Sequence, residues 1–224
     1  MHTGKGQVVE LILQNGFRHM RISCTANLIP APGQYLLAGT ASNDPLPVPL
    51  FYTDSSTEGF ITASPLPASW TPGREIYLRG PLGHGFTLPS SARKVALVAF
   101  DVSFLRLYGL ISQALLQTAA VVLVCDVDAD GLPHEVEIQP LSALDEVIQW
   151  ADYIAFDVER ESLPGLRERL IGLKQIAIRS EAQVFIHASV PCGGIVDCGV
   201  CSVVLRSGWK LACKDGLVFD LREI

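Results

Sequence analysis

The sequence predicts a β barrel followed by an α/β domain and a short cysteine-rich module. Residues 1–89 carry short alternating runs separated by turn residues. Residues 92–186 alternate solid apolar strands with helical segments. Residues 187–224 hold four of the six cysteines of the 224-residue chain. Because each pattern is typical of a different architecture, we expect an antiparallel barrel, then a parallel sheet, then the module.

Six short strands are expected in the first region. Each is bounded by Asn-Gly, Pro-Gly or proline-rich breaks, which favour tight turns. The expected strands are Gln7–Leu13, Phe17–Asn27, Gln34–Ala38, Val48–Thr53, Phe60–Ala63 and Arg74–Arg79. Short strands with such punctuation are typical of an antiparallel barrel.

The second region predicts a parallel sheet with helices on both faces. Its strands are almost wholly apolar, which is the pattern of strands that are covered on both sides. We expect strands at Lys94–Phe100, Val121–Cys125, Tyr153–Phe156 and Gln183–Ile186. We expect helices at Ser103–Ala119, Leu141–Trp150 and Leu163–Leu173, with Ser103 as an N-cap.

The third region is a candidate metal site. Four cysteines follow the spacing C-x5-C-x2-C-x11-C, at Cys192, Cys198, Cys201 and Cys213. Plant-type ferredoxins space their first three cluster ligands as C-x4-C-x2-C, one residue shorter in the first gap. Gly193, Gly194 and Gly199 lie between the cysteines, where backbone amides must curl inward around an anionic centre. A hairpin of Ser202–Leu205 and Lys210–Cys213, turning at Ser207-Gly208, is expected to complete the module.

Zinc is the main alternative to a [2Fe–2S] cluster at these thiols. Structural zinc usually takes two C-x2-C pairs, and only Cys198 and Cys201 form one here. Disulfides are disfavoured, because an acidic chain without an export signal at its N-terminus is expected in a reducing, cytoplasmic environment. The other two cysteines, Cys24 and Cys125, follow apolar strand patterns and are expected to be core residues.

Charge and hydropathy exclude two further classes. The net charge is −6 and no basic stripe is present, so nonspecific nucleic-acid binding is not expected. Residues 107–125 are uncharged for 19 positions, but Gln113 and Gln117 interrupt them and β-branched residues follow. We interpret this run as a buried helix followed by a buried strand, not as a membrane span.

Three motifs resemble one protein family. They are Pro32-Gly33-Gln34-Tyr35, Gly80-Pro81-Leu82-Gly83-His84-Gly85-Phe86 and the ending Cys213-Lys214-Asp215-Gly216-Leu217-Val218-Phe219-Asp220. With the order of barrel, α/β domain and cysteine loop, they resemble the dihydroorotate dehydrogenase electron-transfer subunits, a branch of the ferredoxin-reductase-like flavoproteins. The resemblance implies a [2Fe–2S] cluster that passes electrons between flavins, a redox partner subunit and a hetero-oligomer. Any dihydroorotate oxidation would belong to another chain.

The sequence departs from this family at its flavin contacts. The family's Arg-Pro-x-Ser motif corresponds to Val48-Pro49-Leu50-Phe51, and its Gly-x-Gly-Thr element falls near Ser64-Pro65-Leu66-Pro67. A pyrophosphate needs charge-assisted donors and close backbone approach, and these residues supply neither. Tight FAD binding is therefore not expected.

The nicotinamide contacts differ as well. The expected glycine-rich turn reads Phe100-Asp101-Val102-Ser103-Phe104, and Asp101 would repel a phosphate at a helix N-terminus. Asp157-Val158 stands near the place of the family's later Gly-Pro motif. We predict a reductase scaffold that does not oxidise NAD(P)H directly but keeps its metal centre. Two alternatives stay open: a working FAD-dependent NAD(P)H oxidoreductase with divergent motifs, and a non-redox assembly or regulatory subunit with a structural metal.

Four other residues near the module draw weaker predictions. His84, between two glycines, is expected to be a solvated turn residue, and His187 to be structural or to support the cluster from outside its ligands. Lys210 and Lys214 would raise the reduction potential of a cluster if they approach it. No residue is expected to act as a catalytic acid, base or nucleophile.

Overall fold

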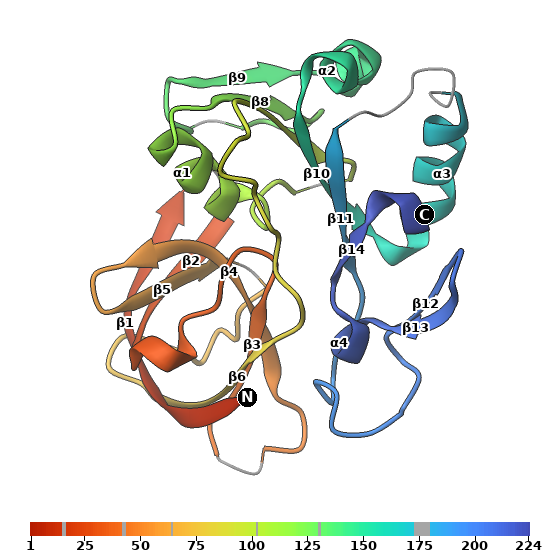
Figure 1. Ribbon diagram of the computed structural model, residues 1–224. Coiled ribbons are helices and arrows are strands. Elements are labelled where there is room, and N and C mark those ends of the chain that lie inside the picture. Colours follow the sequence, from red (N-terminus) through yellow and green to blue (C-terminus); the bar gives the residue numbers. More distant parts are fainter. Residues whose placement is uncertain (15–16, 42–43, 64, 102, 130, 173–179) are drawn as a thin grey trace.

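The computed structural model describes the chain except residues 15–16, 42–43, 64, 102, 130 and 173–179. Figure 1 shows the barrel at the lower left, the α/β sheet above it, and the cysteine loop with its hairpin at the lower right. The last strand of the sheet returns from this loop, so the C-terminal segment is built into the α/β layer.

The predicted six-stranded antiparallel barrel is confirmed. Its strands close in the order β1-β2-β5-β4-β3-β6. They are β1 (His2–Gln14), β2 (Phe17–Cys24), β3 (Tyr35–Gly39), β4 (Val48–Ser56), β5 (Gly59–Ala63) and β6 (Glu75–Leu82). The prediction of a strand to Asn27 was wrong, because residues Ala26–Leu28 form the 3-10 turn η1. Closure by the β1–β6 pair leaves no open sheet edge in the barrel.

The predicted parallel sheet is also confirmed, with two strands more than expected. Its order is β14-β11-β10-β7-β8-β9, and every neighbouring pair is parallel except β14 with β11. The strands are β7 (Lys94–Ala99), β8 (Ala120–Val124), β9 (Val136–Gln139), β10 (Tyr153–Glu159), β11 (Glu181–His187) and β14 (Val218–Asp220). The two missed strands, β9 and β14, are edge strands of four and three residues, too short for their periodicity to identify them.

Three helices connect the parallel strands: α1 (Tyr108–Leu116), α2 (Leu144–Trp150) and α3 (Leu163–Gly172). The 3-10 turn η2 (Leu141–Ala143) precedes α2, and η3 (Arg160–Ser162) precedes α3. The prediction of Ser103 as the N-cap of a longer helix was wrong. Ser103 Oγ accepts from the Leu105 amide at 3.3 Å within the turns that precede α1. The predicted end of the third helix, Leu173, lies outside the described residues. Within the described ranges, no helix has the length and apolarity needed to cross a membrane.

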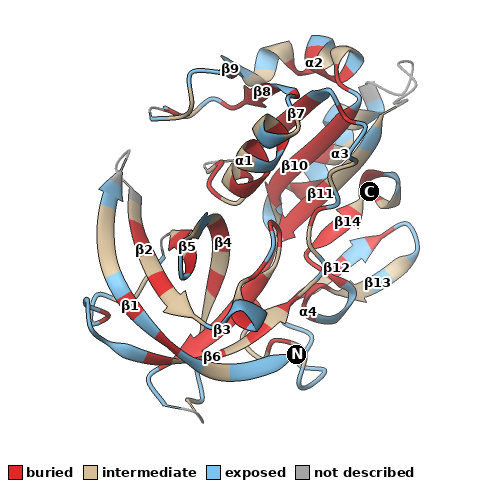
Figure 2. Cartoon of the chain, turned by 60° about the vertical axis from the view of Figure 1, so that its left-hand side comes forward, coloured by how far each residue is buried: buried red, intermediate tan, exposed pale blue. Residues whose placement is uncertain are grey.

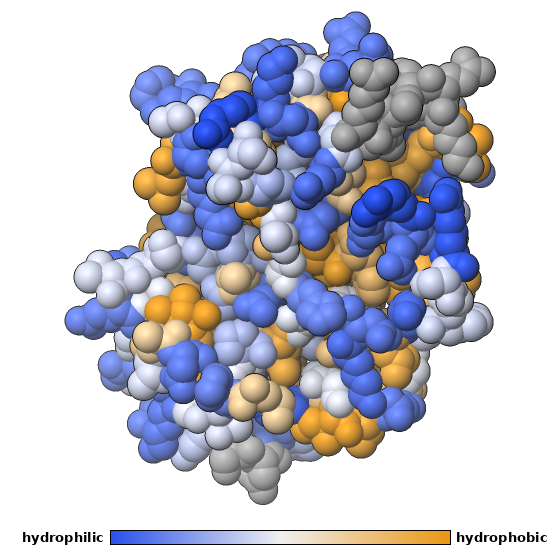
Figure 3. Space-filling model, in the orientation of Figure 1, coloured by the Kyte–Doolittle hydropathy of each residue, from blue (hydrophilic) through white to orange (hydrophobic). Residues whose placement is uncertain are grey.

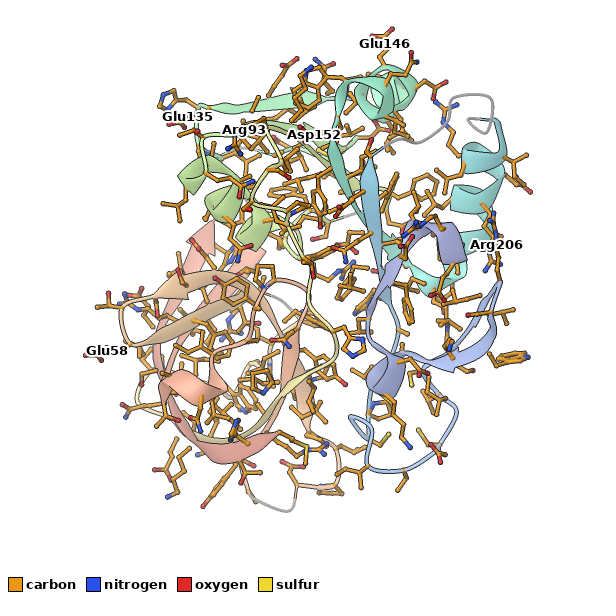
Figure 4. The ribbon with its side chains drawn as sticks, viewed as in Figure 1. Glu58, Arg93, Glu135, Glu146, Asp152 and Arg206 are labelled. Atoms are coloured by element: carbon orange, nitrogen blue, oxygen red, sulfur yellow. The ribbon has the colours of Figure 1, made fainter. Side chains whose placement is uncertain are left out.

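The central strands of the α/β layer are buried and largely apolar. Figure 2 shows β7, β10 and β11 largely in the colour of buried residues, and six consecutive residues of β10, Tyr153 to Val158, are buried. One end of this sheet is fixed by Asp152, whose carboxylate accepts from the Arg93 and Lys94 amides at 3.0–3.2 Å. Figure 4 labels Arg93 and Asp152 at this end. This buried, hydrogen-bonded sheet therefore provides a rigid support for the loops at its opposite end.

The C-terminal region folds as a hairpin and a short helix. The hairpin pairs β12 (Ser202–Leu205) with β13 (Gly208–Leu211), and α4 (Ala212–Asp215) follows directly. Its two-residue turn is Arg206-Ser207, one position earlier than predicted, because Gly208 (φ 110°) is already paired with Leu205. The predicted second strand likewise begins and ends two residues too late, and Cys213 lies in α4. The final 3-10 turn, η4 (Leu221–Glu223), packs against β11.

Candidate metal centre

The structure brings the four C-terminal cysteines together in two pairs. The Sγ atoms of Cys192 and Cys198 are 3.6 Å apart, and those of Cys201 and Cys213 are 3.2 Å apart. Two of the four come from the loop after β11, one from the start of the hairpin and one from α4. The Cys213 amide donates to Cys201 Sγ at 3.5 Å. Four thiols from one short stretch therefore share a single locality.

Glycine shapes the loop that presents these thiols. Gly193, Gly194 and Gly199 have φ of 53°, 82° and 74°, the left-handed region that side chains disfavour. A Cβ at Gly193 would also lie 2.5 Å from Leu37 Cδ1 and 2.8 Å from Arg79 Nη2. The loop therefore rests directly on strands β3 and β6 of the barrel. Arg79 holds it there by donating to the Cys192 carbonyl at 2.7 Å.

The two pairs differ in exposure, and one thiol of each, Cys192 and Cys213, has a shifted pKa. Cys201 and Cys213 are buried, whereas Cys198 is exposed. Burial opposes ionisation of Cys192, but the backbone of Val196 and Gly194 and the neighbouring thiols outweigh it, so the pKa of Cys192 is lowered. Burial and the Cys201 thiol raise the pKa of Cys213 to about 12. Cys192 is thus more readily ionised than Cys213.

The donor set fits a two-iron cluster. A tetrahedral metal with bonds of about 2.3 Å separates two of its thiolates by about 3.8 Å, so the pair at 3.6 Å is close to this spacing and the pair at 3.2 Å would open slightly. A [2Fe–2S] centre takes four cysteine thiolates in all, so each pair can serve one iron. In the described part of the chain, no three or more His, Cys, Asp or Glu side chains form a ready-made site for one metal ion. The predicted ligand residues therefore lie together, as two pairs and not as one cage.

The remaining two cysteines are core residues, as predicted. Cys24 packs against the barrel core, and burial raises its pKa to about 11. Cys125 is 4% exposed beside β8, and burial raises its pKa as well. Cys24 belongs to the separate barrel core, whereas Cys125 shares the larger core cluster with Cys201 and Cys213 but lies directly after β8.

A second region, which we call the aromatic cleft, is a group of packed rings between barrel and sheet. It consists of Tyr35, Phe51, Phe185 and His187. Phe51 of β4 occupies it, with ring centroids 5.7 Å from Tyr35, 5.8 Å from Phe185 and 5.3 Å from His187. Phe51 is the residue that stands where the resembled family has the serine of its flavin motif. Its side chain therefore packs against the sheet at the position of a flavin contact.

A buried ion-pair network adjoins this aromatic cleft. Arg106 Nε donates to both carboxylate oxygens of Asp157 at 2.8 and 3.0 Å, and Arg106 Nη2 donates to Glu159 at 2.9 Å. His187 Nδ1 lies 2.6 Å from the other oxygen of Glu159. Asp101 also belongs here, since its carboxylate accepts from the Glu159 amide at 2.5 Å. The sequence analysis missed Arg106, although an aspartate inside a solid apolar strand signals a buried cation.

The electrostatics of the network favour the charged pair at Arg106. Burial opposes its charge, but Asp157 and Glu159 raise the pKa of Arg106. Burial raises the pKa of the Asp157 carboxyl, and Arg106 opposes that rise. For Glu159, burial is outweighed by His187 and Arg106, which lower its pKa. The guanidinium also lies over the Phe185 ring, 5.5 Å from its centroid.

The described residues do not fit the family's nucleotide contacts. Val48 and Phe51 are apolar at the flavin motif, and Asp101 places a carboxylate at the nicotinamide turn, where it already binds the Glu159 amide. Ser64 and Val102, which belong to the two other predicted departures, lie outside the described residues. At the positions that are described, neither a phosphate nor a flavin ring finds a charge-assisted donor.

The other predicted residues lie near the module without joining the thiols. His187 is engaged by Glu159 and by Phe51, which is a structural role. His84 is exposed and packs against Gly216, whose added Cβ would lie 2.8 Å from the imidazole. Lys214 pairs with Asp197 at 2.5 Å, so its charge is partly compensated. That Lys210 or Lys214 tunes a cluster stays a prediction.

The chain is similar in sequence to a curated electron-transfer subunit. No family model matches the chain. It is 22% identical over 220 residues to a probable dihydroorotate dehydrogenase B (NAD(+)) electron-transfer subunit of Thermoplasma acidophilum, covering 86% of this chain and 80% of that protein. The predicted resemblance is confirmed.

Solved structures agree on the ferredoxin-reductase-like fold. An NADH-dependent reduced ferredoxin-NADP oxidoreductase, studied for flavin-based electron bifurcation, superposes with a TM-score of 0.71 at 16% identity, covering 97% of this chain and 88% of its own. The ferredoxin-NADP+ reductase of Plasmodium falciparum gives 0.57 at 12% identity, covering 82% and 95%. These likenesses place the barrel and the parallel sheet in one fold with the reductases.

Proposed function

We propose that this chain is an electron-transfer subunit that holds a [2Fe–2S] cluster on Cys192, Cys198, Cys201 and Cys213. The observation that carries the proposal is the convergence of these four thiols in two pairs, on a ferredoxin-reductase-like scaffold. When bound, the cluster supplies one-electron transfer. The chain's own residues ligate it, surround it with loop amides and seal its inner side within the protein. Residues 187–224 form the cluster-binding module in this proposal.

A redox partner subunit is the second part of the proposal. Large apolar side chains stand exposed on the cysteine loop, at Ile195 (66%), Val196 (53%) and Val200 (44%), and on the hairpin that follows, at Trp209 (75%). Figure 3 shows hydrophobic atoms gathered at the lower right, where Figure 1 places the cysteine loop. An apolar surface beside a redox centre favours contact with another protein. The similarity to an electron-transfer subunit supports the same conclusion.

Direct NAD(P)H oxidation is not part of the proposed function. The filled aromatic cleft and the carboxylate of Asp101 support a chain that receives electrons from a partner without binding a nicotinamide itself. On this proposal FAD is absent or weakly held. A working FAD-dependent NAD(P)H oxidoreductase is the alternative that a tightly bound flavin would favour.

A structural metal is the other alternative, and one observation favours it. The inner pair, Cys201 and Cys213, joins the hairpin to α4 in the buried interior. A module of under about 40 residues often needs a metal or a disulfide to fold. A zinc ion or a non-redox cluster there would staple an assembly or regulatory subunit.

Anaerobic purification tests these possibilities together. We expect two irons and two acid-labile sulfides per chain, visible absorption, and an EPR signal after reduction by dithionite. One equivalent of zinc without iron would favour the structural alternative. FAD released in stoichiometric amount by heat denaturation would contradict the nucleotide part of the proposal. Co-purification of the native complex would identify the partner.

A further inference from the structure

Tyr35 is a buried tyrosine in the same core cluster as two of the thiols. Tyr35 of β3 is fully buried, and among the described residues its hydroxyl makes no hydrogen bond. Buried tyrosine hydroxyls are normally paired, because loss of water without a replacement bond is costly. Phenylalanine would fill the same space without this cost. The unpaired hydroxyl therefore points to a partner other than a protein atom.

The surroundings of Tyr35 link it to the cysteine-rich module. Its ring contacts Phe51 in the aromatic cleft, and an added Cβ on Gly83 would lie 3.4 Å from its Cε1 atom. Tyr35 belongs to the same buried cluster as Cys201 and Cys213. After burial, the thiols Cys213 and Cys201 are the largest influences that raise the pKa of the Tyr35 hydroxyl. Among the described residues, the ionisable groups that act on this hydroxyl are therefore the cysteine thiols and Arg79.

Arg79, the nearest cation that acts on this hydroxyl, does not serve as its partner. Its guanidinium donates to the Cys192 carbonyl at 2.7 Å and opposes the rise in the tyrosine pKa. A guanidinium has only donors, so it cannot accept the tyrosine proton. An anionic sulfur, in contrast, can accept it.

We propose that the Tyr35 hydroxyl donates a hydrogen bond to a sulfur of the iron–sulfur centre and thereby raises its reduction potential. Reduction adds negative charge to the cluster, so a donor to sulfur stabilises the reduced form more than the oxidised form. This inference rests on the proposed function. Tyr35 acts as a positioning residue that tunes the centre, since it takes no part in ligation.

The variant Tyr35→Phe tests the hydrogen bond with two independent measurements. In iron-loaded protein, we expect the reduction equilibrium to weaken about fivefold, the weight of one ordinary hydrogen bond, which is about 40 mV for a one-electron couple. The Fe–S resonance Raman bands of the wild type should shift in D2O, and this contribution should disappear in the variant. In metal-free protein, the variant should unfold at the same urea concentration as the wild type or a higher one.

Tyr153→Phe is the matched control. Tyr153 is equally buried, but its hydroxyl donates to Gln183 at 2.8 Å, away from the thiols. This variant should lower the urea midpoint of metal-free protein and leave the reduction potential unchanged. The two tyrosines should therefore give opposite patterns.

The outcomes separate this inference from the proposed function. A loaded wild type whose potential and Raman bands match those of Tyr35→Phe would overturn the hydrogen bond alone. So would a metal-free Tyr35→Phe that is destabilised as much as Tyr153→Phe, because the hydroxyl would then have a protein partner. A wild type that binds no iron would overturn the proposed function, and this inference with it.

Discussion

The cysteine loop and the aromatic cleft satisfy their polar groups in opposite ways. In the aromatic cleft, Arg106, Asp157, Glu159 and His187 bind one another at 2.6–3.0 Å, and Phe51 fills the space beside them. At the cysteine-rich module, the four thiols lie in two close pairs, and among the described residues the buried Tyr35 hydroxyl has no hydrogen-bond partner. The polar side chains beside the aromatic cleft bind one another and leave no group for a ligand. The thiol pairs and the unpaired tyrosine hydroxyl, in contrast, are groups that a bound cluster would engage. On the proposed function, this difference separates a region closed by its own side chains from a region that a cofactor would complete.

The largest effect is expected from replacing one of the four clustered cysteines, which should remove the proposed cluster. Serine at position 192, 198, 201 or 213 replaces a soft thiolate by a poor iron ligand. Each Cys→Ser variant should lose most of the visible absorption and the iron content of anaerobically purified protein. Cys24→Ser and Cys125→Ser are the controls and should keep the full spectrum. Equal iron in a ligand variant and the wild type would contradict the assignment.

The next largest effect, on stability, is expected from breaking the ion pairs of Arg106 beside the aromatic cleft. Arg106→Met keeps the unbranched stem of the side chain but removes the guanidinium, so it leaves the Asp157 carboxylate buried without its cation. We expect the free energy of unfolding at neutral pH to fall by about 3–5 kcal/mol, measured with urea. Arg222→Met removes an exposed ion pair with Asp220 and should change stability little.

The pH dependence of Arg106→Met sharpens the same test. Burial already raises the pKa of Asp157, and loss of Arg106 should raise it further. A raised carboxyl pKa means that the cost is fully present above the folded pKa and disappears as the carboxyl is protonated at lower pH. The deficit of the variant should therefore shrink on acidification, with an unchanged cluster spectrum. A deficit that is constant with pH would indicate lost packing instead.

A moderate effect is expected when the aromatic cleft regains the family's serine. Phe51→Ser removes the ring that touches Tyr35, Phe185 and His187. Since Phe51 is only partly buried, we expect a loss of about 2 kcal/mol in urea unfolding, below the range for a full core phenylalanine. Flavin fluorescence should show no tight FAD binding, because Val48 still replaces the phosphate-binding arginine. Tight binding by this single variant would show that Phe51 alone closes the site.

The smallest effect concerns Glu159, whose pKa is lowered by His187 and Arg106 against the effect of burial. A lowered carboxyl pKa contributes stability that is present above the ordinary value of 4.5 and is lost as pH falls through the folded pKa. Glu159→Gln should therefore cost about 1 kcal/mol near neutral pH and less in acid. Thermal unfolding across this range measures it. Glu161→Gln, at an exposed carboxylate nearby, is the control.

Much of the fold could be predicted because its elements carry strong local patterns. The solid apolar run of β7 and the alternation in β2 determine strand and face without reference to distant residues. The edge strands β9 and β14 escaped prediction because only their neighbours make them strands. The predicted helix at Ser103 was too long for the same reason, since its first residues are buried by tertiary contact and not by helical periodicity.

The candidate site likewise has one part that the sequence could predict and one part that it could not. The spacing of the cysteines and the glycines between them already indicated the thiol cluster, because ligands close in sequence can meet through a short loop. Tyr35 and Cys213 are separated by 178 positions in the sequence, and Arg106 and Asp157 by 51, so no local pattern joins them. The sequence by itself determined the barrel, the parallel sheet and the set of thiols. Only the tertiary structure decided which thiols pair, what fills the aromatic cleft and which hydroxyl faces the centre, because burial and charge pairing arise between segments that the chain brings together only on folding.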